Sequence, residues 1–78
     1  MNKERRSVLR NISERLGSIR DEIETVMDDE QDAYYNLPDS IQASDRGYQM
    51  QDNVNDLQGV IETIDNDVID KLDSIAAE

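Results

Sequence analysis

The sequence predicts an all-α fold in which two long helices run antiparallel as a helical hairpin, and three observations support this prediction. Apolar residues recur at alternating spacings of three and four in both halves of the 78-residue chain, the heptad pattern of a helix with one buried seam. The two seams are mirror images of each other about Ser40. The only proline, Pro38, lies beside this mirror point, where the chain must turn.

The first helix is expected over residues 3–36. No proline interrupts this segment, and it is rich in Glu and Arg, which favour helix. Because a residue that precedes proline is biased away from the α region, the helix should end near Asn36, just before Leu37. Its seam consists of Leu9, Ile12, Leu16, Ile19, Ile23 and Val26.

Residues 37–44 are expected to form the corner. Pro38 suits the first position of a short helical turn, since it has no amide hydrogen to satisfy there. Ser44 is a candidate N-cap, so the second long helix could begin at Pro38 or at Ser44. The mirror relation places Ala33 level with Gly47, where small residues would let the two arms approach closely.

The second helix is expected over residues 44–77, so that residues 1–78 form a single hairpin. After Val68 the apolar spacing slips, at Leu72 and Ile75, which is a stutter that locally unwinds a supercoil. The seam residues before the slip are Val54, Leu57, Ile61, Ile64 and Val68.

The charge distribution agrees with this register, in which Val26 faces Val54 and Ile19 faces Ile61. The net charge is −11, and six of the eight basic residues lie in the first twenty positions. In the hairpin this basic stretch lies level with the acidic C-terminal arm, so intramolecular neutralisation is the simpler interpretation. Direct contact with nucleic acid or with an anionic membrane would need a net positive surface, and neither is expected.

The composition excludes several classes of function. The chain has no cysteine and no histidine, and so lacks the commonest general base and the commonest transition-metal ligand. The run DDEQD, which starts at Asp28, lacks the glycine and the ligand spacing of an EF-hand loop, and is interpreted as a solvated helix face. No apolar run reaches the length of a signal or membrane segment. We therefore expect a cytoplasmic protein that has no cofactor and is not an enzyme.

All three tyrosines gather at the predicted corner: Tyr34, Tyr35 and Tyr48. Aromatic side chains there could cap the open end of the seam. Alternatively, with Asp45 and Arg46 beside them, they could form a recognition surface, since tyrosine offers a large contact area with a polar group.

The corner also carries a resemblance. The block E-Q-x-A-Y-x-N-L-P-x-S-I-Q-x-S-x-R-G, from Glu30 to Gly47, resembles a pattern that recurs in small uncharacterised acidic proteins of bacteria and their phages. The resemblance implies a helical hairpin encoded by a phage or mobile element and located in the cytoplasm of a bacterial host. It implies no catalytic residues.

The apolar stripe is wider than two helices can cover, because further apolar residues lie beside the seams: Val8, Met27, Val60 and Ile69. We therefore expect two hairpins to associate as a homodimer, in a four-helix bundle. The expected function is a protein-interaction module that binds or inhibits a host protein. The alternative is a structural or assembly spacer that self-associates through its coiled-coil seam.

A narrower form of the first hypothesis is a nucleic-acid mimic. An acidic helical rod could occupy the groove of a basic nucleic-acid-binding protein, with strong salt sensitivity. The mimicking charges would be Asp45, Asp52, Asp56, Glu62, Asp70 and Asp73.

Overall fold

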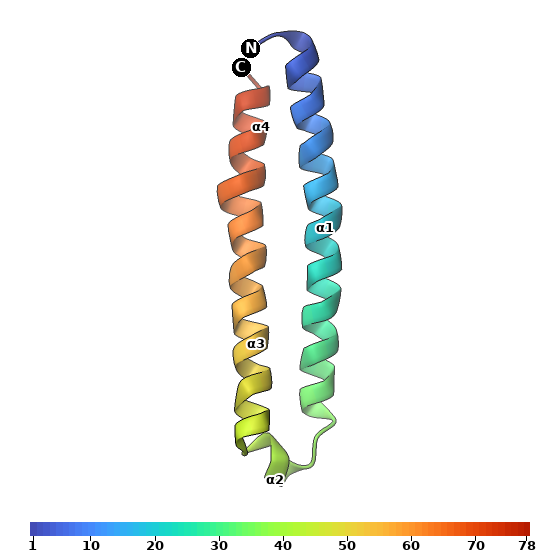
Figure 1. The fold of residues 1–78 in the computed structure, drawn as a ribbon, viewed down its shortest axis with the longest axis vertical. Coiled ribbons are helices and arrows are strands. Elements are labelled where there is room, and N and C mark those ends of the chain that lie inside the picture. Colours follow the sequence, from blue (N-terminus) through green and yellow to red (C-terminus); the bar gives the residue numbers. More distant parts are fainter.

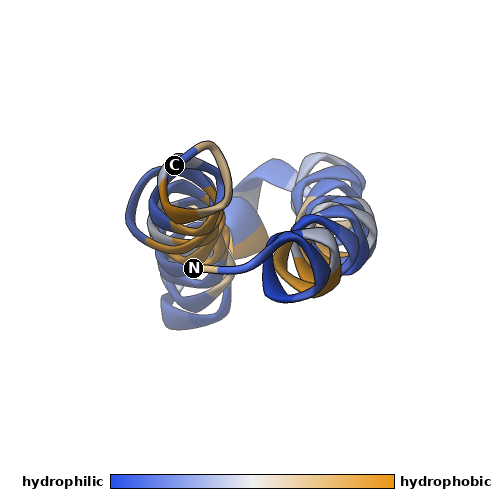
Figure 2. Ribbon diagram, turned by 90° about the horizontal axis from the view of Figure 1, so that it is seen from above, coloured by the Kyte–Doolittle hydropathy of each residue, from blue (hydrophilic) through white to orange (hydrophobic).

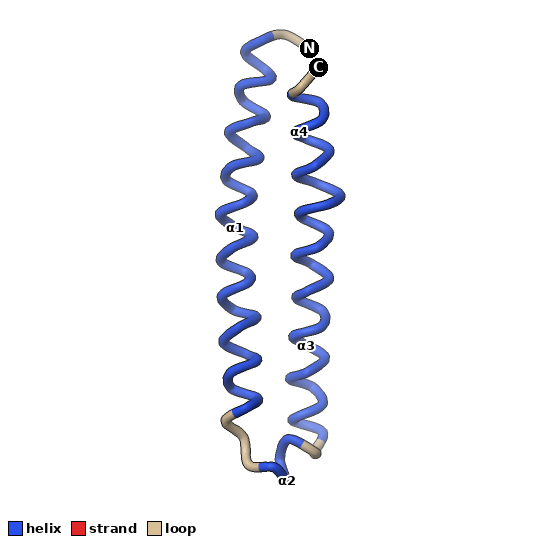
Figure 3. The backbone as a smooth tube through the Cα atoms, turned by 180° about the vertical axis from the view of Figure 1, so that it is seen from behind, coloured by secondary structure: helices blue, strands red, loops and turns tan.

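The computed structural model describes all 78 residues as a rod of two antiparallel helical arms, with both termini at one end (Figure 1). Helix α1 (Lys3–Tyr35) is the first arm. A short helix, α2 (Asp39–Gln42), forms the corner. The second arm contains α3 (Asp45–Glu62), the π-helical segment η1 (Thr63–Ile69) and α4 (Asp70–Ala76), which follow one another without a break (Figure 3). The predicted all-α helical hairpin is confirmed.

The corner uses both of the predicted helix starts. Helix α1 ends at Tyr35, one residue earlier than expected. Pro38 lies immediately before the first residue of α2, and Ser44 immediately before that of α3. The Ser44 side chain does not cap α3, however, because its hydroxyl donates instead to the backbone carbonyl of Ile41.

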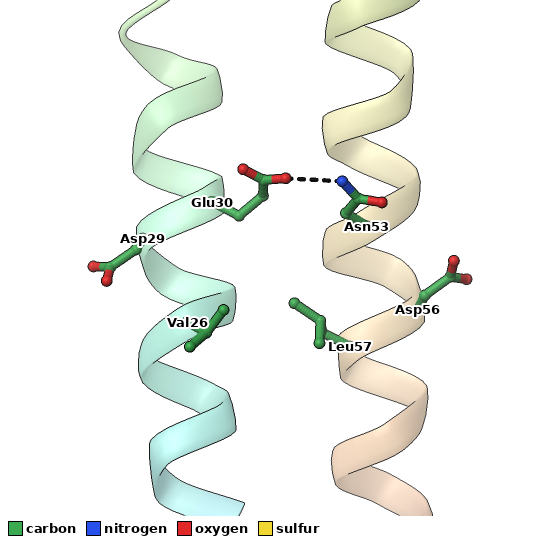
Figure 4. A pocket seen from close by; sticks show the side chains of 6 residues that line it. All are labelled: Val26, Asp29, Glu30, Asn53, Asp56 and Leu57. Atoms are coloured by element: carbon green, nitrogen blue, oxygen red, sulfur yellow. Dashed lines mark hydrogen bonds between the residues drawn. The ribbon is translucent and has the colours of Figure 1, made fainter.

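The register of the two arms differs from the prediction. Asn53 donates a hydrogen bond from Nδ2 to Oε2 of Glu30 across the seam, at 2.9 Å. One turn away, Val26 lies opposite Leu57 (Figure 4). The predicted pairing of Val26 with Val54 is therefore wrong.

The pairs Glu30 with Asn53 and Val26 with Leu57 are both centred between Ile41 and Gln42. The mirror point near the corner therefore lies there instead of at Ser40. The physical reason is that a heptad pattern tolerates a shift of three residues, since each apolar residue then meets the next seam position on the other arm. The corner removes this ambiguity. Helix α2 adds a helical turn after Pro38, so the second arm begins later than a simple reversal at Ser40 would allow.

The contact line on α1 is also rotated relative to the predicted seam. Ile19 and Val26 are 48% and 58% exposed, although both were expected in the seam. Ser13 is buried, and Arg20 and Met27 are half-buried. Helix α1 thus contacts the second arm partly through Ser13, Arg20 and Met27, each of which follows a predicted seam residue. Those seam residues, Ile12, Ile19 and Val26, lie to one side of the contact line.

The core is thin. Only two hydrophobic residues, Ile61 and Ala76, are buried, and the Cα atoms span 59 × 16 × 11 Å. Seen along the rod, the hydrophobic residues gather on the sides of the arms that face each other, while most of the outer surface is hydrophilic (Figure 2). None of the helices combines the length and the apolar character that crossing a membrane requires.

The predicted stutter coincides with the π-helical segment η1. A π-turn accommodates one extra residue and rotates the helix that follows it. Beyond η1 it is Ala76 that is buried, with 2% exposure, while Ile75 is 38% exposed. The expected place of Ile75 in the seam is therefore wrong, because the extra residue moves the inward position by one.

Candidate interaction surfaces

One broad side of the hairpin carries a row of exposed or half-buried aliphatic residues on each arm. Val26 of α1 and Asn53 of α3 line the same hollow between the arms, so both positions open on the same side. Ile19 precedes Val26 by two helical turns, and Val60 follows Asn53 by two turns, so they continue these rows. We call this surface the apolar face; its aliphatic members are Ile12, Ile19, Val26, Leu57, Val60 and Ile64.

The hollow in the apolar face has a volume of about 500 Å³. Val26 and Leu57 point toward each other within it, and the hydrogen-bonded pair of Glu30 and Asn53 closes one end (Figure 4). Two carboxylates point outward on the two sides: Asp29 of α1 and Asp56 of α3 (Figure 4). An aliphatic floor with acidic edges suits a side chain that has an apolar stem and a cationic head.

The corner brings together only part of the predicted tyrosine cluster. The rings of Tyr34 and Tyr35 pack edge to face, with centroids 5.6 Å apart and an interplanar angle of 66°. Tyr34 is half-buried, whereas Tyr35 is 68% exposed. Tyr48 is 60% exposed and lies outside this aromatic pair, and Arg46 nearby is also exposed.

Gln42 is an important residue that the sequence analysis missed. Its side-chain amide donates to the backbone carbonyls of Tyr34 and Leu37, at 3.2 and 3.1 Å, and more distantly to that of Tyr35. The last carbonyls of a helix have no partner within the helix, so Gln42 caps the end of α1. The signal that could have found it is its position in the quoted corner block, four residues after the proline.

Gly47, in the first turn of α3, lies close to the backbone of Gln42. A Cβ atom at this position would lie 2.0 Å from the carbonyl oxygen of Gln42. The close approach is therefore between α3 and the backbone of α2. The predicted approach to Ala33 is wrong, since Ala33 is exposed.

Polar contacts join the basic stretch of α1 to the acidic second arm. Arg20 donates from Nε to Asp65 Oδ2 at 3.1 Å and also pairs with Glu24. The pKa of the Arg20 guanidinium is raised above its usual value: desolvation alone would lower it, but the hydrogen bond and charge of Asp65, then of Glu24, outweigh that effect. Ser13 donates to Asp73 at 2.6 Å. Of the basic residues in the first twenty positions, only Arg20 forms an ion pair with the second arm, so the expected neutralisation is seen as a specific contact at this one residue.

The acidic residues proposed as mimicking charges lie on the second arm and are all exposed: Asp45, Asp52, Asp56, Glu62, Asp70 and Asp73. Three of them have other contacts. Asp73 accepts the hydrogen bond from Ser13, Glu62 accepts one from Gln58 on its own helix, and Asp56 lies at the edge of the hollow. Nowhere does a group of carboxylates have the arrangement to hold a metal ion.

The fold and these surfaces define an acidic helical hairpin with one unpaired apolar face. Comparison of the chain with protein-family models, with curated proteins and with solved structures finds no match. The surfaces are therefore interpreted from their own chemistry.

Proposed function

We propose that this chain is a non-enzymatic protein-interaction module that works as a homodimer, with two hairpins packed as a four-helix bundle and an acidic outer surface. The observation that supports this most strongly is the apolar face, where Ile19, Val26 and Val60 are about half exposed in a chain with a thin core. Exposed contiguous apolar surface of this kind marks protein contacts in soluble proteins.

The dimensions of the rod also favour dimerisation. The radius of gyration is 17.4 Å, against about 11.5 Å for a compact domain of this length. The broad side measures 59 × 16 Å between Cα atoms, a projected area of about 900 Å², which is similar to the roughly 800 Å² that each partner buries in a standard interface. Covering the apolar face would thus supply the core that a single hairpin lacks.

The concentration dependence of unfolding tests the proposal. A homodimer gains stability from mass action, so its melting temperature, followed by circular dichroism, should rise between 5 and 500 µM chain, values chosen to span about two orders of magnitude. An unchanged melting temperature over this range, with a monomer mass at its upper end, would overturn dimerisation.

A heterologous partner is tested by affinity purification with the intact chain and with a variant in which all three tyrosines are alanine. We expect a protein partner whose recovery depends on the exposed tyrosines at the corner, Tyr35 and Tyr48. If the chain recovers only itself, the spacer alternative is supported instead.

Nucleic-acid mimicry is a second candidate, favoured by exposed acidic residues on the second arm that form no hydrogen bond or ion pair with α1: Asp45, Asp52, Glu62 and Asp70. The chain would then displace a labelled DNA duplex from a basic DNA-binding protein. Displacement should weaken steeply with salt and when these four carboxylates are changed to amides. Displacement that is unaffected by these changes would contradict mimicry.

A further inference from the structure

We infer that the second copy lies on the apolar face in the opposite direction, so that the corners of the two hairpins point to opposite ends of the dimer. This inference rests on the proposed dimerisation. It adds the orientation of the copies and the residues that meet across the interface.

Two-fold symmetry favours this orientation. A closed dimer with two-fold symmetry needs a surface that is complementary to itself. In α1 this row contains the half-buried Ile12 and the exposed Ile19 and Val26 at equal spacing, so it is symmetric about Ile19. When α1 packs antiparallel to α1 of the second copy, Ile19 meets its own counterpart and Ile12 meets Val26.

The hollow between Val26 and Leu57 also favours the opposite orientation. If both hairpins pointed in the same direction, the two hollows would face each other. Asp29 of one copy would then lie near Asp56 of the other, on both edges, and the aliphatic floors would remain unfilled. Like charges placed together at an interface disfavour that arrangement.

The opposite orientation fills the hollow. Val26 and Leu57 at the floor of the hollow then face a part of the second copy that lies two helical turns from its Ile19, toward its termini. That part contains Ile12 and Lys71 of the second copy. Lys71 is exposed and falls in the same row as Asp56, once the extra residue in η1 is counted. Its aliphatic stem would cover the floor while its ammonium group pairs with Asp56.

Charges on the outer edge of α1 agree with this orientation. Arg15, Glu22 and Asp29 form one row along the edge of the apolar face, at spacings of two turns. The point midway between Arg15 and Glu22 lies beside Ile19, the centre of symmetry. Each Arg15 therefore lies level with Glu22 of the second copy, which gives two ion pairs per dimer.

Distance measurement between spin labels tests the orientation directly. The chain has no cysteine, so Ser40→Cys at the corner and Ser18→Cys near the centre each give one labelling site. In the opposite orientation the Ser40 labels should be about 60 Å apart, since some twenty residues at 1.5 Å rise separate the centre from each corner. The Ser18 labels should be within roughly 30 Å in either orientation and act as the control.

The outcomes separate the two proposals. A long Ser40 distance with a short Ser18 distance supports the inference. Short distances at both sites would overturn the orientation and leave dimerisation intact, while dipolar coupling at neither site would overturn dimerisation itself. As an independent measure, Arg15→Glu should weaken dimerisation ~3- to 10-fold, and adding Glu22→Arg should restore it. No recovery in the double variant would contradict the predicted pair.

Discussion

The α-carbon of Gly47 lies so close to the carbonyl oxygen of Gln42 that an added Cβ would sit 2.0 Å from that oxygen. The first turn of α3 therefore rests directly on the end of α2. Because the Gln42 side chain also donates to the carbonyls of Tyr34 and Tyr35 at the end of α1, this last residue of α2 contacts both arms. These contacts join the corner to both arms.

Gly47→Ala should destabilise the hairpin by about 1–3 kcal/mol, because the methyl group would collide with backbone that cannot move aside easily. Urea unfolding followed by circular dichroism measures this loss. The matched controls are Gly17→Ala and Gly59→Ala, where a Cβ would meet nothing within 4 Å. Each control should gain up to ~1 kcal/mol from the higher helix propensity of alanine. Equal effects at all three glycines would contradict the contact.

Gln42→Ala should cost about 1–2 kcal/mol, because the carbonyls of Tyr35 and Leu37 lose a hydrogen-bond donor, while that of Tyr34 keeps the Leu37 amide. Gln58→Ala is the control, since the Gln58 amide reaches only Glu62 on the exposed side of its own helix. Hydrogen exchange provides a second measurement. We expect faster exchange of the Asn36 and Leu37 amides in the Gln42 variant and not in the control, and identical exchange would argue against a capping role.

The Arg20 and Asp65 pair should show coupling in a charge swap. Arg20→Glu places a carboxylate opposite Asp65 and should lower the melting temperature. The double variant Arg20→Glu with Asp65→Arg should recover part of this loss, because opposite charges are again adjacent. Additive effects of the two substitutions would show that the pair contributes nothing across the seam.

Added salt should stabilise the protein. The net charge of −11 repels itself in any compact state, and salt screens this repulsion. The melting temperature should therefore rise between roughly 20 and 300 mM sodium chloride, a range over which the screening length falls several-fold. A fall over the same range would mean that attractive ion pairs such as Arg20 with Asp65 outweigh the general repulsion.

The sequence was sufficient to predict the helices and their antiparallel direction. The heptad spacing indicates each helix by itself, and the isolated Pro38 between the two spacings marks where the chain turns. It was insufficient for the register, since a shift of three residues preserves the spacing and the helical turn that α2 adds at the corner decides between the alternatives. The exposure of Ile75 was missed for a similar reason. The extra residue in η1 changes the phase of α4, and the spacing alone does not show which apolar residue then faces inward.

The apolar face is the central element of this account, and sedimentation equilibrium of Val60→Glu tests it most directly. Asn55→Glu is the matched control, because it adds the same charge to α3 at an exposed position roughly 140° away around the helix. The unchanged chain and the Asn55 variant should sediment with about twice the 8.9 kDa chain mass, and the Val60 variant as a monomer, since a carboxylate is costly to bury in an apolar interface. Equal association of the two variants would contradict the account.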